Sequence, residues 1–113
     1  MGLSVKWDQG VAVEYRGSRV VFDPQVRSSA YQGVFITHAH VDHAKGLTFP
    51  KPGKFSTRGT LDLMLAVRGK PVNNIRILNY ADVVRLDHVD VRACDAGHIL
   101  GSCIYEVTTP EGN

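Results

Sequence analysis

The sequence predicts a single mixed α/β domain that consists mostly of short β-strands and has one clear helix. Its 113 residues suit one domain that buries about two-thirds of its unfolded surface. Short apolar segments recur between turn-forming residues, and only residues 61–68 have the apolar spacing of a helix. A dense group of histidines follows one of the apolar segments, which predicts that the domain carries a metal site.

Three strands are expected at the start of the chain, over 3–7, 11–15 and 19–22. Gln9-Gly10 and residues 16–18 separate them and suit hairpin turns. The third strand ends at Asp23-Pro24, because proline cannot continue a strand ladder. Asp23 has two interpretations at this point: an ordinary turn residue, or a carboxylate that orients a metal-binding histidine.

The central stretch of the chain runs from Val34 to Gly46. Residues 34–36 form an apolar run typical of a buried strand, and a short helical turn is expected over 44–47. Four polar side chains follow the strand within six residues: His38, His40, Asp42 and His43. In an extended segment His38 and His40 project to the same face, so they can converge on one ion. Three imidazoles and a carboxylate at this spacing suit zinc or a similar metal.

The second half alternates strands with one helix. Strands are expected over 54–57, 76–78, 83–86, 89–93 and 103–108. In the helix, 61–68, Thr60 would cap the N-terminus, Asp62 would lie in the first turn, and Gly69 would end the helix. His88 is expected in an exposed hairpin turn, not at a metal.

A second group of interest is the segment from Asp95 to Ser102. His98 lies there between glycines, just after a strand. Alone it would be an ordinary loop histidine. Together with the first group, it supplies the third imidazole that His38 and His40 lack.

Charge and cysteine usage narrow the setting. The formal charge of +2 is mild, but residues 45–76 contain a single acid against seven bases. The run marks either a surface for a polyanion or an ordinary solvated face. The candidate phosphate contacts are Lys45, Lys51, Lys54 and Arg58. The sequence shows no signal peptide and no apolar run long enough for a membrane span, so a cytoplasmic protein is expected.

Cys94 and Cys103 are expected to be reduced, although a disulfide or a place at the metal site stays open.

The first histidine group resembles a known signature. His38-x-His40-x-Asp42-His43 is similar to the metal motif of the metallo-β-lactamase superfamily of metallohydrolases. Asp23, at the end of an early apolar strand, matches the acidic residue that precedes this motif in the family. The resemblance therefore favours the orienting interpretation of Asp23.

Two further segments resemble one branch of that superfamily. Ala-Gly-His-Ile-Leu-Gly-Ser at 96–102 is similar to the G-H-x-L-G stretch of the β-CASP nucleases. This branch holds RNA cleavage-and-polyadenylation endonucleases, Artemis-type DNA nucleases and RNase J. Residues 56–64 resemble the branch's strand-to-helix passage after the first metal motif. The likeness covers essentially the whole chain, in register with the first half of the family domain.

The resemblance implies an αββα sandwich, and residues 1–113 would form the first half of it, roughly the first sheet with its helices. His38, His40 and His98 would hold one zinc, while Asp42 and His43 would contribute to a second. Asp42 would also accept a proton during catalysis. The family's bridging aspartate and last histidine belong to its second half, so one zinc is expected here and two in the complete site.

The expected function is that of a metal-dependent nuclease that hydrolyses phosphodiester bonds in RNA or single-stranded DNA, with little or no turnover by this chain alone. Two alternatives stay open: a hydrolase of small thioesters or lactones, and a non-catalytic half-domain that binds metal or nucleic acid. Since half a sandwich leaves apolar surface exposed, the chain is also expected to form homo-oligomers or to associate with the C-terminal part of the fold.

Overall fold

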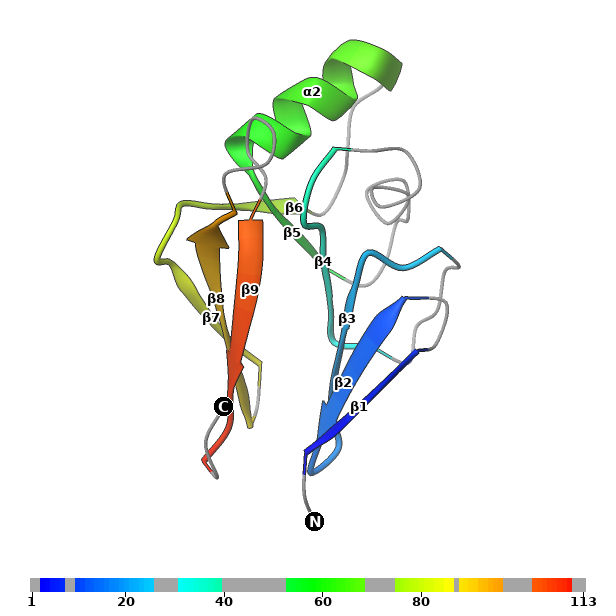
Figure 1. Cartoon of the computed structure of the whole chain (residues 1–113), viewed down its shortest axis with the longest axis vertical. Helices are drawn as coiled ribbons and strands as arrows, with labels where there is room; N and C mark the ends of the chain where they lie inside the picture. Colours follow the sequence, from blue (N-terminus) through cyan, green and yellow to red (C-terminus); the bar gives the residue numbers. More distant parts are fainter. Residues whose placement is uncertain are drawn as a thin grey trace.

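Two β-sheets face each other across a shared apolar core in the computed structural model (Figure 1). The structure describes residues 3–7, 10–25, 31–39, 53–68, 75–86, 88–96 and 103–110. The larger sheet has the strand order β1-β2-β3-β4-β5-β6, and the smaller sheet has the order β7-β8-β9. Mixed α/β structure with one helix among the described residues is the fold class that the sequence predicts.

The larger sheet is antiparallel at one end and parallel beyond it. Its strands are β1 (Ser4–Trp7), β2 (Val11–Tyr15), β3 (Ser18–Phe22), β4 (Gly33–Phe35), β5 (Lys54–Thr57) and β6 (Ile75–Leu78). The β1–β2 and β2–β3 pairs are antiparallel, whereas β4, β5 and β6 follow β3 in parallel. Arg16 and Gly17 connect β2 to β3 with φ angles of 51° and 83°, the left-handed conformation that a tight hairpin turn requires.

The smaller sheet is an antiparallel meander of β7 (Val83–Leu86), β8 (Val89–Asp95) and β9 (Cys103–Thr108). Figure 1 shows this sheet facing the β1–β3 part of the larger one. The expectation that the chain supplies roughly one sheet is therefore wrong. Strands from both layers of the sandwich are present, because the meander folds back over the larger sheet and buries the apolar face of that sheet.

The core lies mainly between the two sheets. Phe22, Phe35 and Phe55 stack in a row, with ring centroids 5.3 Å and 4.7 Å apart, and Val91 of β8 lies in the same cluster. A second cluster forms on the other face of the larger sheet, where Met64 of the helix packs with residues of β3 and β4. β3 and β4 are thus buried on both faces, which explains their continuous apolar sequence.

The single described helix, α2 (Arg58–Arg68), begins earlier than the sequence suggests. Thr57 is the capping residue, since its Oγ1 accepts a hydrogen bond from the Thr60 amide at 3.3 Å. The prediction of Thr60 as the cap is therefore wrong. The first turn holds no acid, so the placement of Asp62 there is wrong too. Asp62 instead lies 3.9 Å from Arg58, one turn earlier on the exposed surface.

No helix in the described ranges is both long enough and apolar enough to cross a membrane.

Candidate metal centre

The site lies where two neighbouring parallel strands end. β3 and β4 pair in register up to Phe22 and Phe35. Asp23 follows the first of these strands, and Thr37-His38 lies just beyond the second. Because parallel strands end at the same edge of a sheet, residues 14 positions apart in the sequence become neighbours.

Asp23 forms three hydrogen bonds with the segment that carries His38. Its backbone amide donates to the Phe35 carbonyl at 2.9 Å, and its carboxylate accepts two hydrogen bonds from Thr37. The Thr37 amide donates to Oδ1 at 2.8 Å, and the Thr37 hydroxyl donates to Oδ2 at 2.7 Å. Asp23 has a φ of 53°, a conformation that aspartate tolerates better than most residues. This conformation directs the side chain back toward Thr37.

The hydrogen bonds also define the proton positions on His38. The Thr37 hydroxyl has one proton, and that proton goes to the Asp23 carboxylate. At 2.8 Å from Nδ1 of His38, the same oxygen must therefore accept, so Nδ1 carries a proton. The lone pair of the neutral ring then lies on Nε2. This is a form in which imidazole binds zinc, and the arrangement of carboxylate, hydroxyl and imidazole resembles the outer hydrogen bonding of many zinc sites.

Two bonds from the smaller sheet reach the same segment. The Tyr105 hydroxyl donates to the Ile36 carbonyl at 2.7 Å, and the Cys103 amide donates to the Thr37 carbonyl at 2.8 Å. Burial raises the pKa of the Tyr105 hydroxyl well above its usual range, and it raises the pKa of the Cys103 thiol to about 11. Both groups are therefore neutral near pH 7.

The other predicted ligands, His40, Asp42, His43 and His98, lie outside the described residues. In the part of the chain that the structure describes, no three His, Cys, Asp or Glu side chains gather as a metal site. The described residue that can be tested, His38, fits zinc in its protonation and its hydrogen bonding. The residues that flank the His98 segment are described, and one of them, Cys103, is bonded to Thr37.

The remaining candidate residues divide between surface and interior. His88 is exposed in the β7–β8 turn, as predicted. Lys54 is buried, with 1% of its surface exposed, and this desolvation lowers its pKa. That burial does not fit the predicted phosphate contact. Arg58 is exposed at the start of α2, whereas Lys45 and Lys51 lie outside the described residues.

Cys94 and Cys103 do not form a disulfide with each other in the structure. Cys94 pairs in register with Ile104, and Cys103 pairs with Asp95. Adjacent positions of a strand face opposite sides of the sheet, so the two thiols point away from each other.

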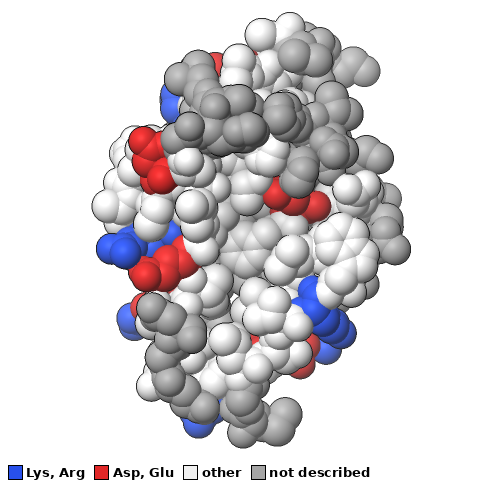
Figure 2. All heavy atoms as spheres, in the orientation of Figure 1, with Lys and Arg blue, Asp and Glu red and all other residues white. Residues whose placement is uncertain are grey.

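A groove of about 420 Å³ runs between β9 and the β1–β3 part of the larger sheet. Its lining is mostly apolar and includes Trp7, Val11, Tyr105 and Val107, and it also touches Asp23 and Thr37. Figure 2 shows mostly uncharged surface in the middle of this face, with the Lys and Arg side chains nearer its margins. The candidate metal centre therefore borders an apolar opening between the sheets.

Comparison with solved structures defines the class of fold. A metallo-β-lactamase of Cronobacter sakazakii with a HARLDQ motif matches 98% of this chain and 56% of its own, with a TM-score of 0.74 and 16% identity. At that identity the likeness shows the fold alone, and the fold is that of the metallo-β-lactamases. No protein-family model matches the chain.

Sequence relatives specify the branch. An RNase J-like protein of Methanocaldococcus jannaschii is 30% identical in an alignment of 119 positions that includes 81% of this chain and 28% of the relative. RNase aCSPSF2 of Saccharolobus solfataricus is 27% identical in an alignment of 114 positions that includes 80% of this chain and 23% of the relative. The chain thus spans about a quarter of the length of these relatives. These relatives, together with the shared fold, support the predicted resemblance to the metallo-β-lactamase superfamily and to its β-CASP branch.

Sequence reasoning missed Thr37, which joins Asp23 to His38, and Tyr105, which bonds the preceding residue. A hydroxyl residue directly before the first histidine was the available signal for Thr37. Tyr105 lies 69 residues from its partner, and no local pattern marks it.

Proposed function

We propose that this chain forms the N-terminal part of a zinc-dependent nuclease that cleaves phosphodiester bonds in RNA. In this proposal His38, His40 and His98 hold the first zinc ion, Asp42 and His43 contribute to a second, and the chain alone retains one ion.

The observation that carries the proposal is the hydrogen-bonded series from Asp23 through Thr37 to His38. It places a proton on Nδ1 of His38, so that in the neutral ring the lone pair lies on Nε2, at the end of a buried parallel strand. This hydrogen-bonded series requires Asp23 to hold a left-handed backbone conformation, which is unfavourable in conformational energy for a residue other than glycine. In this proposal, orienting a metal-binding imidazole is the function that this conformation serves.

When bound, zinc would supply a Lewis acid that activates water near neutral pH and stabilises charge on the phosphate. The residues of the chain would do the rest. Asp23 and Thr37 hold the proton on Nδ1 of His38, so that this ring does not compete for the proton of the reacting water. Asp42 is proposed to accept that proton.

RNA is proposed as the substrate because both sequence relatives carry names of RNases. Of the candidate phosphate contacts, Arg58 is exposed at the N-terminal end of α2. Lys45 and Lys51 remain proposed phosphate contacts, whereas Lys54 is buried and is not proposed as one. Binding through such cations would weaken as salt is added.

Zinc content tests the metal site first. His38→Ala, His40→Ala and His98→Ala should each weaken zinc retention by about tenfold or more, as loss of a ligand does. His88→Ala is the matched control, since this exposed imidazole lies in a turn and should leave zinc binding unchanged. Equal zinc content in all four variants would contradict the ligand assignment.

Substrate class is tested separately with a labelled single-stranded RNA, the same sequence as DNA, and a simple thioester. Very slow, zinc-dependent cleavage of RNA is expected from the 113-residue chain. Turnover of the thioester alone would replace the nuclease by the small-molecule hydrolase, and no turnover with firm zinc binding would favour a non-catalytic half-domain.

A further inference from the structure

The peptide group between Ile36 and Thr37 is held at both ends by side chains. Its carbonyl oxygen accepts the Tyr105 hydroxyl proton at 2.7 Å, and its amide donates to Oδ1 of Asp23 at 2.8 Å. Asp23 follows β3 in the larger sheet, whereas Tyr105 belongs to β9 in the smaller sheet. One peptide plane is thus fixed from both layers of the sandwich, two residues before His38.

Tyr105 acts where the regular ladder stops. β4 pairs with β5 only up to Phe35 and Phe55, so the Ile36 carbonyl lies one residue beyond the paired strand. The tyrosine ring is fixed by packing, with its centroid 5.2 Å from that of Phe35 and 5.4 Å from that of Phe22. A hydroxyl on so rigid a ring defines the direction of the carbonyl it bonds.

We propose that Tyr105 is a positioning residue for His38, because its hydroxyl and the Asp23 carboxylate together fix the Ile36–Thr37 peptide that presents the imidazole. The zinc part of the test rests on the proposed function, while the positioning itself is a property of the metal-free protein. Since Cys103 of the same strand bonds the next carbonyl, that of Thr37, β9 holds two successive peptide groups of the candidate ligand segment.

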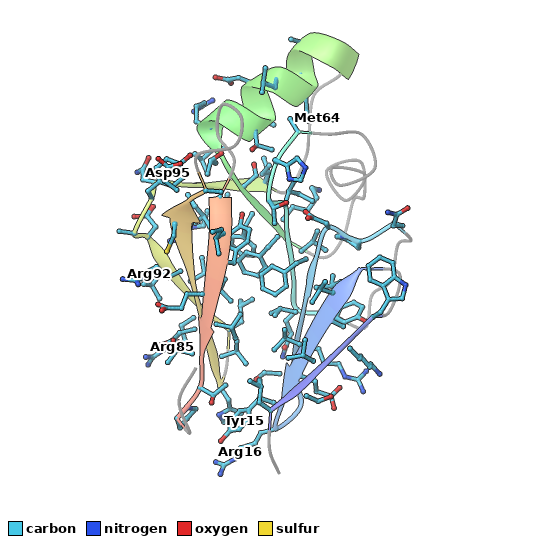
Figure 3. All side chains as sticks on the ribbon, in the orientation of Figure 1. Tyr15, Arg16, Met64, Arg85, Arg92 and Asp95 are labelled. Carbon is cyan, nitrogen blue, oxygen red and sulfur yellow. The ribbon has the colours of Figure 1, made fainter. Side chains whose placement is uncertain are left out.

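A purely structural role for Tyr105 makes a different prediction. In that case Tyr105→Phe would destabilise the domain and affect His38 only as much as any lost buried hydroxyl does. Tyr15→Phe is the matched control, because Tyr15 is fully buried in the same core cluster. Figure 3 shows Tyr15 at the end of the molecule remote from Asp95, near which β9 begins.

The first measurement is zinc affinity of the full 113-residue chain by competition with a chromophoric chelator. Tyr105→Phe should weaken binding by about tenfold, the lower end of the range for residues that orient metal ligands. Tyr15→Phe should leave affinity within about twofold of wild type. Equal affinities in both variants would overturn the proposal, whether both were unchanged or both reduced.

A double-variant comparison tests whether the two side chains act on one peptide. If Asp23→Asn and Tyr105→Phe act through the same group, their combined loss of zinc affinity should fall well short of the product of the single losses. Asp23→Asn combined with Tyr15→Phe should give the full product. Independent effects of Asp23 and Tyr105 would overturn the shared-peptide mechanism.

The last measurement needs no zinc and separates this inference from the proposed function. The ¹⁵N shifts of the His38 ring in metal-free protein report which nitrogen carries the proton. Wild type and Tyr15→Phe should show Nδ1–H, and Tyr105→Phe should show a mixture of tautomers. Identical His38 spectra in all three would refute positioning by Tyr105. A changed spectrum in a protein that binds no zinc would instead reject only the proposed function.

A wild-type titration covers the case in which Tyr105→Phe does not fold. On addition of zinc, the resonances of Ile36 and of the Tyr105 ring should shift in step with those of His38, while Tyr15 stays unchanged. Tyr105 resonances that do not shift when zinc binds at His38 would overturn the inference.

Discussion

Asp23→Asn is the most informative single substitution, because it keeps the shape of the side chain and reverses the direction of its hydrogen bond with the Thr37 hydroxyl. Asparagine also tolerates the left-handed φ of 53°, so the backbone should not move. Its oxygen can still accept from the Thr37 amide, but its NH₂ group donates and cannot accept the Thr37 hydroxyl proton. The hydroxyl must then turn and donate to Nδ1 of His38. The ring proton moves to Nε2, and the lone pair that would bind zinc is lost.

The expected loss of zinc affinity is about 10- to 100-fold, which corresponds to about 1.4 to 2.7 kcal/mol. The effect on folding should be smaller than the total stability of a typical domain. Two charge-assisted hydrogen bonds are replaced by neutral ones, which lowers the free energy of unfolding by about 1 to 3 kcal/mol out of roughly 5 to 15 kcal/mol. The variant should therefore remain folded while its metal site weakens.

Zinc affinity and the ¹⁵N shifts of His38 would be measured on wild type, Asp23→Asn and Asp62→Asn. The control removes the same charge from an exposed position on α2 and should change neither quantity. Unchanged zinc affinity in Asp23→Asn would show that Asp23 does not orient a ligand. Weaker zinc binding with the His38 proton still on Nδ1 would contradict the tautomer mechanism.

Three further outcomes are expected. Burial raises the pKa of Cys103 from 9.0 to about 11, so as pH rises the unfolded chain loses this proton before the folded chain does. The free energy of unfolding, measured in urea, should therefore fall as pH rises from about 9 through about 11. Cys103→Ala should reduce that fall. Trp7 is 69% exposed on edge strand β1 beside the apolar groove, so light scattering should show that the chain self-associates. Trp7→Lys should shift the chain toward monomer, and the control Lys6→Gln should not. A monomeric wild type would contradict this expectation. Thr57→Ala should lower the free energy of unfolding by about 1 kcal/mol through loss of the α2 cap, with zinc affinity unchanged; no loss of stability would exclude Thr57 as the cap.

Most strands follow directly from the sequence because each is a short apolar run between turn residues. The expected β2, β5, β7 and β9 have the observed bounds, β4 is shifted by one residue at both ends, and the other strands differ by one or two residues at one end. The helix start was mistaken because Thr57 and Thr60 are both good caps in sequence. Tertiary structure decides between them, since β5 ends at Thr57 and the chain turns directly into the helix.

The charge pattern failed at Lys54 for a similar reason. Its position in a basic run suggests surface, yet it lies in β5 between two parallel strands, β4 and β6. A residue in the middle of a covered sheet is buried whatever its charge, and the desolvation appears as a lowered pKa. Sequence neighbours such as Arg58 remain exposed because they lie on the helix.

The meeting of the two sheets at Thr37 gives a physical reason to expect His98 near His38, although 60 residues separate them in the chain. Asp95 and Cys103 are partners in the β8–β9 ladder, so the segment between them begins and ends on adjacent strands, about 5 Å apart. Cys103 is itself bonded to the carbonyl of Thr37, the residue before His38. The sequence shows two histidine motifs but not this bond. The bond holds Cys103, which directly follows the second motif, against Thr37, which directly precedes the first, and replacing the hydroxyl of Tyr105 tests how strongly β9 contributes to this contact.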